Sequence, residues 1–79
     1  MRTEPVNSIV KVVVSKILHL PLDQITDDST SNTVDEWDSL GHMKIILALE
    51  EEFGLTFDNS QIAEMTSISM ISSIIEAKS

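Results

Sequence analysis

Apolar residues recur at helical spacing near the start of the chain. Five of them define the pattern: Val6, Ile9, Val10, Val13 and Ile17. Pro5 suits a first helical turn, because its fixed φ fits a helix and its missing N–H is not needed there. The valine run at 12–14 would also fit a strand, but the length of the pattern and the proline start favour a helix. We predict a helix from about Pro5 to Leu18.

A long polar segment follows, over residues 20–38. It contains Pro21 and the Asp, Ser and Thr residues from Asp27 to Thr30, and it shows no sustained period. A loop of this length inside a compact domain is uncommon and is usually tied down. We therefore expect its apolar residues Leu22, Ile25 and Val34 to anchor it to the core.

The strongest helical pattern begins after this loop. Asp38 is a favourable N-cap, Gly54 can adopt the left-handed conformation that ends a helix, and Leu55 fits the hydrophobic contact that follows such an end. Between the two caps, apolar residues lie at helical spacings: Leu40, Met43, Ile46, Leu47 and Phe53. The sequence predicts one helix between Asp38 and Gly54.

Two further helices are expected before the end of the chain. Asp58 can cap a short helical segment that runs through Ile62 to Met65, and Thr66 or Ser67 can cap a last helix. Four isoleucines give that helix its buried face: Ile68, Ile71, Ile74 and Ile75. With no internal repeat and no linker, residues 1–79 are expected to form a single all-α domain. Its fold would be a small four-helix bundle of three main helices and one short helix, with a long loop between the first and second.

Composition limits the possible partners. The chain has 79 residues, 42% of them hydrophobic, so it can form one modest core. Thirteen acidic residues against five basic ones give a net charge of −8, which disfavours nucleic acid and anionic membrane surfaces as partners. Partner proteins with basic patches are favoured instead, and we expect a monomer.

Cysteine is absent from the chain, so thiol chemistry would need an imported thiol. No apolar run approaches the roughly 18 residues of a membrane span, and the first five residues lack the apolar core of a signal peptide. These features favour a cytoplasmic location.

Candidate chemistry gathers where the long loop meets the strongest helix. The segment at 37–43 reads Trp-Asp-Ser-Leu-Gly-His-Met, and the following helix ends in Ala-Leu-Glu-Glu-Glu-Phe. With its acidic loop, helix order and distance from both ends, this pattern resembles the attachment site of acyl carrier proteins, and the likeness spans the whole chain. The resemblance implies an acyl-carrier-like four-helix bundle.

The resemblance also implies a cofactor and a role for Ser39. In that family, a phosphopantetheinyl transferase moves 4′-phosphopantetheine from coenzyme A onto this serine, with Mg²⁺ beside the residue that corresponds to Asp38. The arm ends in a thiol that carries acyl groups as thioesters between enzymes. A helix start suits a phosphate ester, because free N–H groups and the positive dipole end lie there. The chain itself would be a carrier and not an enzyme.

These residues allow three other interpretations. Asp38 and Ser39 could be simple helix caps. Ser39 and His42 could share a helix face as nucleophile and base, but no orienting group, oxyanion hole or pocket is visible in so short a chain, so we expect His42 to be an exposed contact residue or merely solvated. The acidic loop from Asp27 has partial calcium-loop spacing, yet Asn32 replaces the turn glycine and Asp38 replaces the bidentate glutamate. We therefore predict no metal site.

The strongest helix carries two apolar sets, and one helix cannot bury both equally. By resemblance, one set faces the core: Ile45, Ile46, Leu49 and Phe53. The other side is expected to meet partner enzymes: Leu40, Met43, Lys44, Leu47, Glu50 and Glu51. The alternative is that Leu40, Met43 and Leu47 are core. Trp37 either packs against the arm or is a loop aromatic held by the core.

The residues after the motif set this chain apart from carriers of primary fatty acid synthesis. Those carriers typically continue acidic, whereas Gly41, His42 and Lys44 follow here. This departure favours a specialised carrier of modified acyl, polyketide or aminoacyl groups. An aminoacyl or peptidyl carrier, or an unmodified helical interaction module, remains the alternative.

Overall fold

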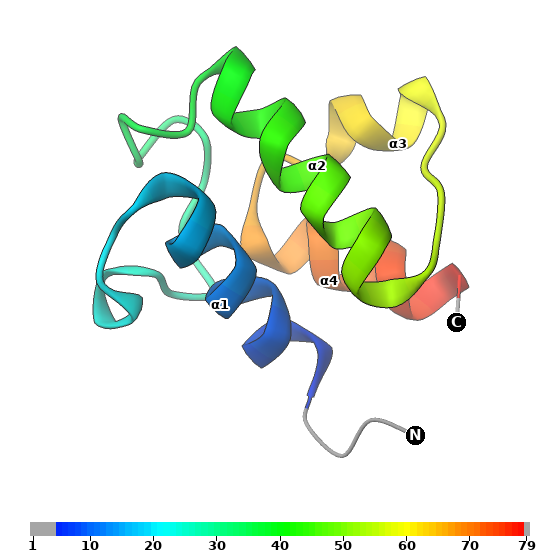
Figure 1. Ribbon diagram of the computed structural model, residues 1–79, viewed down its shortest axis with the longest axis horizontal. Helices are drawn as coiled ribbons and strands as arrows, with labels where there is room; N and C mark the ends of the chain where they lie inside the picture. Colours follow the sequence, from blue (N-terminus) through cyan, green and yellow to red (C-terminus); the bar gives the residue numbers. More distant parts are fainter. Residues whose placement is uncertain (1–4, 79) are drawn as a thin grey trace.

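Four α-helices make up the regular structure of residues 5–78, the part of the chain that the computed structural model describes (Figure 1). In chain order they are α1 (Val6–Leu18), α2 (Ser39–Phe53), α3 (Asn59–Glu64) and α4 (Ile68–Lys78). A short 3₁₀ turn, η1 (Leu22–Gln24), interrupts the long loop between α1 and α2. The predicted all-α bundle is confirmed, with three main helices, one short helix and the long loop in the expected place. The residues before Pro5, where the sequence shows no apolar leader, lie outside the described part.

The core is mainly aliphatic and lies where α1, α2 and α4 meet, with the aromatic rings of Trp37 and Phe57 also buried in it. α1 packs against both α2 and α4. The side chains that form most of the core are at most 9% exposed: Val10, Val13, Val14, Leu18, Ile45, Ile46, Leu49, Met65, Ile68, Ile71 and Ile75. The valines of α1 are therefore helical because this face is buried, since packing supplies more helix stability than propensity does.

Each predicted cap is present. Gly54 ends α2 with φ 65° and ψ 37°, and Leu55 follows it against the core. Asp58 and Gln61 form a capping box at the start of α3. Of the two candidates for the last helix, Ser67 is the cap, because its Oγ accepts a hydrogen bond from the Met70 N–H at 3.1 Å.

The long loop is anchored differently from the prediction at one of three positions. Ile25 is buried and Val34 packs partly against the core, as expected. The prediction for Leu22 was wrong: its side chain is 50% exposed, because the 3₁₀ turn holds it at the surface.

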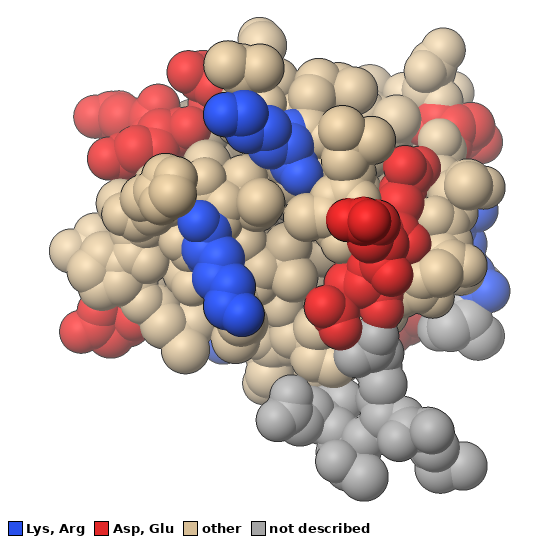
Figure 2. Space-filling model, in the orientation of Figure 1, with Lys and Arg blue, Asp and Glu red and all other residues tan. Residues whose placement is uncertain are grey.

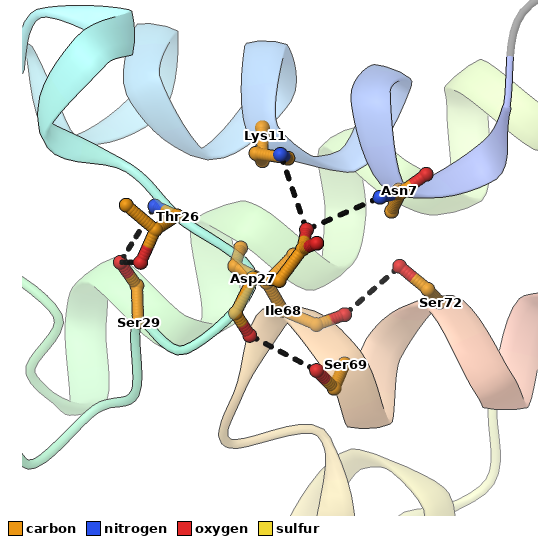
Figure 3. A network of polar contacts seen from close by, with 8 residues as sticks. All are labelled: Asn7, Lys11, Thr26, Asp27, Ser29, Ile68, Ser69 and Ser72. Atoms are coloured by element: carbon orange, nitrogen blue, oxygen red, sulfur yellow. Dashed lines mark hydrogen bonds and ion pairs between the residues drawn. The ribbon is translucent and has the colours of Figure 1, made fainter.

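Polar contacts supply further anchors for the loop (Figure 3). The Asp27 carboxylate accepts a hydrogen bond from Asn7 and pairs with Lys11, both on α1 and both at 3.1 Å. Ser69 on α4 donates to the Asp27 backbone carbonyl at 2.9 Å. Asp27 therefore ties the loop to two helices at once.

The loop also pairs with the segment between α3 and α4. The Ser31 N–H donates to the Thr66 carbonyl at 2.8 Å, and the Ile68 N–H donates to the Ser29 carbonyl at 3.1 Å. Between them, Thr30 and Ser67 form an isolated antiparallel bridge. These contacts hold the second half of the loop beside the start of α4.

The start of α2 lies far from both the start of α1 and the end of α4 (Figure 1). Figure 2 shows acidic side chains gathered over the second half of α2, with lysine side chains over α1 and the first half of α2. Among residues 5–78, no helix is long and apolar enough to cross a membrane.

Candidate functional site

Ser39 is the first residue of α2, and its side chain is exposed. Its Oγ makes no hydrogen bond with any described residue, so the hydroxyl is free to react. The N–H groups of the first helical turn and the positive end of the helix dipole surround this position. The backbone thus favours negative charge on a group attached to Ser39.

Asp38 caps the helix directly before this serine. Its Oδ1 accepts a hydrogen bond from the Gly41 N–H at 2.8 Å. Asp38 is therefore the N-cap of α2, as predicted. The cap occupies one carboxylate oxygen, and Oδ2 makes no hydrogen bond within the described chain.

Gly41 brings the first turn of α2 into close contact with the loop. A Cβ at this position would lie 2.8 Å from the Glu36 carbonyl oxygen and 3.1 Å from Cδ2 of Leu18. A contact under 3 Å is shorter than real Cβ atoms accept, and the first obstacle is backbone, which cannot rotate away. Gly41 therefore sets how closely the helix start approaches the end of α1 and the loop.

A chain of two hydrogen bonds links the loop, α2 and α3 beside the serine. Trp37 Nε1–H donates to His42 Nδ1 at 2.9 Å, and His42 Nε2 lies 2.8 Å from the Ile62 carbonyl oxygen. Tryptophan can only donate, so Nδ1 is the acceptor and Nε2 carries the proton that it gives to the carbonyl. We call this arrangement the Trp37–His42–Ile62 bridge.

The bridge corrects the prediction for His42. That residue is half-buried and uses both ring nitrogens, so it is neither exposed nor merely solvated. Trp37 is 2% exposed, which agrees with a loop aromatic held by the core. Since His42 has no free nitrogen, it cannot act as a base for Ser39.

The site also offers room for a group on the serine. A hollow of about 300 Å³ opens beside it, which we call the serine hollow. It is lined by Ser31, Trp37, Asp38, Ser39, His42 and Thr66. A free hydroxyl at a helix start, with space next to it, fits the attachment of phosphopantetheine. No cluster of three or more His, Asp or Glu side chains within residues 5–78 could hold a metal ion.

Comparison with known proteins identifies the family. The family model described as "Phosphopantetheine attachment site" matches residues 8–75, which is most of the chain. The chain belongs to this family. It is a carrier protein whose prosthetic group is phosphopantetheine, and it is not an enzyme.

A solved structure shows the same fold as this carrier. The solution structure of a holo acyl carrier protein from Geobacter metallireducens superposes with a TM-score of 0.83. The two sequences are 20% identical, and the match covers 95% of this chain and 86% of the other.

The residues expected to meet partners fall into two groups in the carrier. Leu40, Met43 and Leu47 are 65%, 47% and 59% exposed, so the alternative that they belong to the core is wrong. Lys44 and Glu51 are also exposed. Glu50 is the exception among the predicted partner-binding residues, because its side chain is only partly exposed.

Glu50 is held by a contact inside the molecule. Its Oε2 accepts a hydrogen bond from the Phe57 N–H at 3.0 Å. This contact links the end of α2 to the segment before α3, so the Glu50 carboxylate has a structural role in the fold.

Two features of the site were not predicted from the sequence. The bridge joins residues five and twenty positions apart, and no short motif marks such a contact. Gly41 did carry a signal, because a lone glycine inside a strong helical pattern often has a packing reason.

Proposed function

We propose that this chain is an acyl carrier protein and that Ser39 is its attachment residue. The observation that carries the proposal is the free, exposed Ser39 hydroxyl at the first position of α2, inside the region that the family model matches. Its neighbours support attachment as well: Asp38 caps the helix, and Gly41 lets the helix start lie close to the loop. We further propose that residues 1–79 form one carrier domain, because the described helices share one core.

Residues of the chain would hold Ser39 at the exposed start of α2 and stabilise the phosphate ester formed there. Asp38 caps the helix through Oδ1, so its carboxylate would still have an oxygen available to a Mg²⁺ ion held by the transferase and coenzyme A. The first-turn N–H groups favour the phosphate ester. When bound, phosphopantetheine supplies a thiol that holds acyl groups as thioesters. The carrier contributes position and recognition, and its partners contribute the chemistry.

The proposed partner surface lies on α2 next to the serine, and we call it the partner face. It consists of Leu40, Met43, Lys44, Leu47 and Glu51, with Glu50 at its edge. Exposed apolar residues of this size beside charged ones are typical of a surface that binds another protein. The expected partners are the phosphopantetheinyl transferase and acyl-loading or acyl-transfer enzymes with basic patches, because the chain carries a net charge of −8.

The second candidate cargo is an aminoacyl or peptidyl group. Such a group would use the same arm and the same serine. Gly41, His42 and Lys44 follow the motif instead of acidic residues, which favours a specialised pathway for either cargo. The resemblance of the sequence to acyl carrier proteins favours an acyl group. The cytoplasmic location and the monomeric state stay predictions of the sequence.

An intact mass measurement tests the attachment. The carrier is incubated with coenzyme A, Mg²⁺ and a broad-specificity phosphopantetheinyl transferase. We expect the mass of one phosphopantetheine to be added to the parent and to Ser60→Ala, a matched control at another exposed serine near a helix start. Ser39→Ala should gain nothing. No mass gain by the parent with several active transferases would favour the unmodified interaction module.

The Ser39→Ala variant should lose attachment without losing its fold. The Ser39 hydroxyl makes no hydrogen bond with described residues, so its removal should change stability by no more than a cap is worth, about 1 kcal/mol. Circular dichroism and a urea midpoint check this. Loss of the helical spectrum would mean that Ser39 is structural.

A further inference from the structure

The serine hollow is bounded on two sides by contacts that fix its shape. On one side, the Ser31 N–H bonds to the Thr66 carbonyl at 2.8 Å, which holds the loop against the segment between α3 and α4. On the other, the Trp37–His42–Ile62 bridge joins the loop, α2 and α3. The walls are therefore in place before anything binds, and a preformed site costs less ordering on binding than a flexible one.

Two hydroxyls that line the hollow have no partner. The side chains of Ser31 and Thr66 both line it, and neither Oγ of Ser31 nor Oγ1 of Thr66 makes a hydrogen bond with the described residues. Each hydroxyl can both donate and accept. By contrast, Trp37 and His42 have used their N–H groups and ring nitrogens on each other and on Ile62. His42 is partly exposed and contributes ring surface, whereas Trp37 is 2% exposed and contributes almost none. The hollow thus combines two free hydroxyls with the ring surface of His42.

The size and chemistry of the hollow match one part of the prosthetic group. About 300 Å³ lies at the lower end of the usual range for ligand pockets, which is small for an arm together with its cargo. The part of phosphopantetheine next to the phosphate carries a hydroxyl, two methyl groups and an amide. Those polar atoms suit the hydroxyls of Ser31 and Thr66, and the methyl groups suit the ring of His42.

We propose that the serine hollow is a binding site for the phosphate-proximal half of the arm, with Ser31 and Thr66 as its hydrogen-bonding residues. The proposal rests on attachment at Ser39, which fixes the arm's first atom at the edge of the hollow. The thiol half and its cargo then extend beyond the hollow into solution. The site would give the arm a defined exit direction from the carrier.

Nuclear magnetic resonance of the loaded carrier tests this proposal. The arm is labelled with ¹⁵N and the protein is not, so ¹⁵N-edited spectra report only the two arm amides. We expect the amide nearer the phosphate to show a high ¹H–¹⁵N heteronuclear NOE and contacts to Thr66 and His42 protons. The amide nearer the thiol should be mobile.

Variants assign the effect to the two hydroxyls. In Ser31→Ala/Thr66→Val, the inner amide should become as mobile as the outer one and lose its contacts to the hollow. The matched control Thr56→Val/Ser73→Ala removes two exposed hydroxyls elsewhere and should leave the inner amide ordered. Equal mobility of both amides in the parent, or an ordered inner amide in the Ser31/Thr66 variant, would overturn the proposal. Intact mass separates these outcomes from a failure of attachment, in which no arm is present at all.

Discussion

At the scale of single residues, Gly41 and His42, two and three positions after the serine, show opposite ways of fixing a helix start. Gly41 lets the backbone of α2 approach the loop because it has no side chain. His42 fills its position with a side chain that bonds in two directions. Both act on the placement of Ser39.

Gly41→Ala should lower stability, although the same change raises it at most helical positions. Alanine is favoured over glycine in a helix by about 1 kcal/mol. Here the added Cβ would meet the Glu36 carbonyl at 2.8 Å, and such overpacking typically costs about 1–3 kcal/mol. We expect a lower urea midpoint for Gly41→Ala, with Lys44→Ala as a reference at an exposed position of α2. A midpoint above that of the parent would show that the loop can yield.

Removing the bridge should destabilise the carrier through the buried tryptophan. In His42→Phe, the Trp37 N–H loses its acceptor at a position that is 2% exposed, and an unsatisfied buried donor costs about 1–3 kcal/mol. A double-mutant cycle with Trp37→Phe isolates the pair from the loss of ring size. We expect a coupling free energy of about 0.5–3 kcal/mol from the four denaturation curves. Additive effects would mean that the hydrogen bond contributes nothing to stability.

At the scale of elements, α2 separates its two apolar sets onto different sides. Ile45, Ile46 and Leu49 are at most 1% exposed, whereas Leu40 and Leu47 are more than half exposed. The helix therefore exposes large apolar side chains to solvent, and these side chains are not needed for the fold. This arrangement supports the partner face.

Polar replacement on the partner face should affect transfer more than folding. Met43→Gln and Leu47→Gln change exposed side chains, so each should shift stability by no more than about 0.5 kcal/mol. Each should slow attachment or acyl transfer by a partner enzyme. Ile46→Ala is the buried control on the same helix and should cost about 2–5 kcal/mol. Large midpoint drops in the two surface variants would refute this placement of the recognition surface.

The sequence correctly predicted the features that are determined by residues close to them in the chain. The cap residues Asp38, Gly54 and Asp58 and the isoleucine face of α4 are marked by neighbours within a turn or two, and all were correct. The predictions for Leu22 and His42 were wrong because no local pattern in the sequence fixes where either side chain points. An apolar residue in a loop has no period that says which way it faces, and the partner of His42 on α3 is twenty positions away.

At the scale of the whole molecule, the long loop is held by charge as well as by packing. Hydrogen bonds from Asn7 and then from Lys11, together with the Lys11 charge, lower the pKa of Asp27 below its ordinary value of 3.8. Its carboxylate links the loop to α1 (Figure 3). Protonation would weaken both contacts.

Stability should therefore fall with acid in a way that depends on Asp27. A carboxyl group with a lowered pKa in the folded state stabilises the fold fully above its unfolded pKa and loses that effect as the pH falls through its folded pKa. The stability difference between the parent and Asp27→Asn should thus be constant above about pH 5 and shrink below about pH 4. Urea midpoints across this range measure it, with Asp28→Asn as a control on the same loop. A difference that does not change with pH would exclude a role for the charge.

The position of Ser39 relative to the ends of the outer helices also bears on how this molecule can be handled. The first turn of α2 points away from the beginning of α1 and from the end of α4 (Figure 1). A tether joined beyond either helix would leave the serine facing the solution. Immobilised on a sensor chip by either end, the carrier should accept its arm equally well, so one surface can report both loading and the binding of successive enzymes.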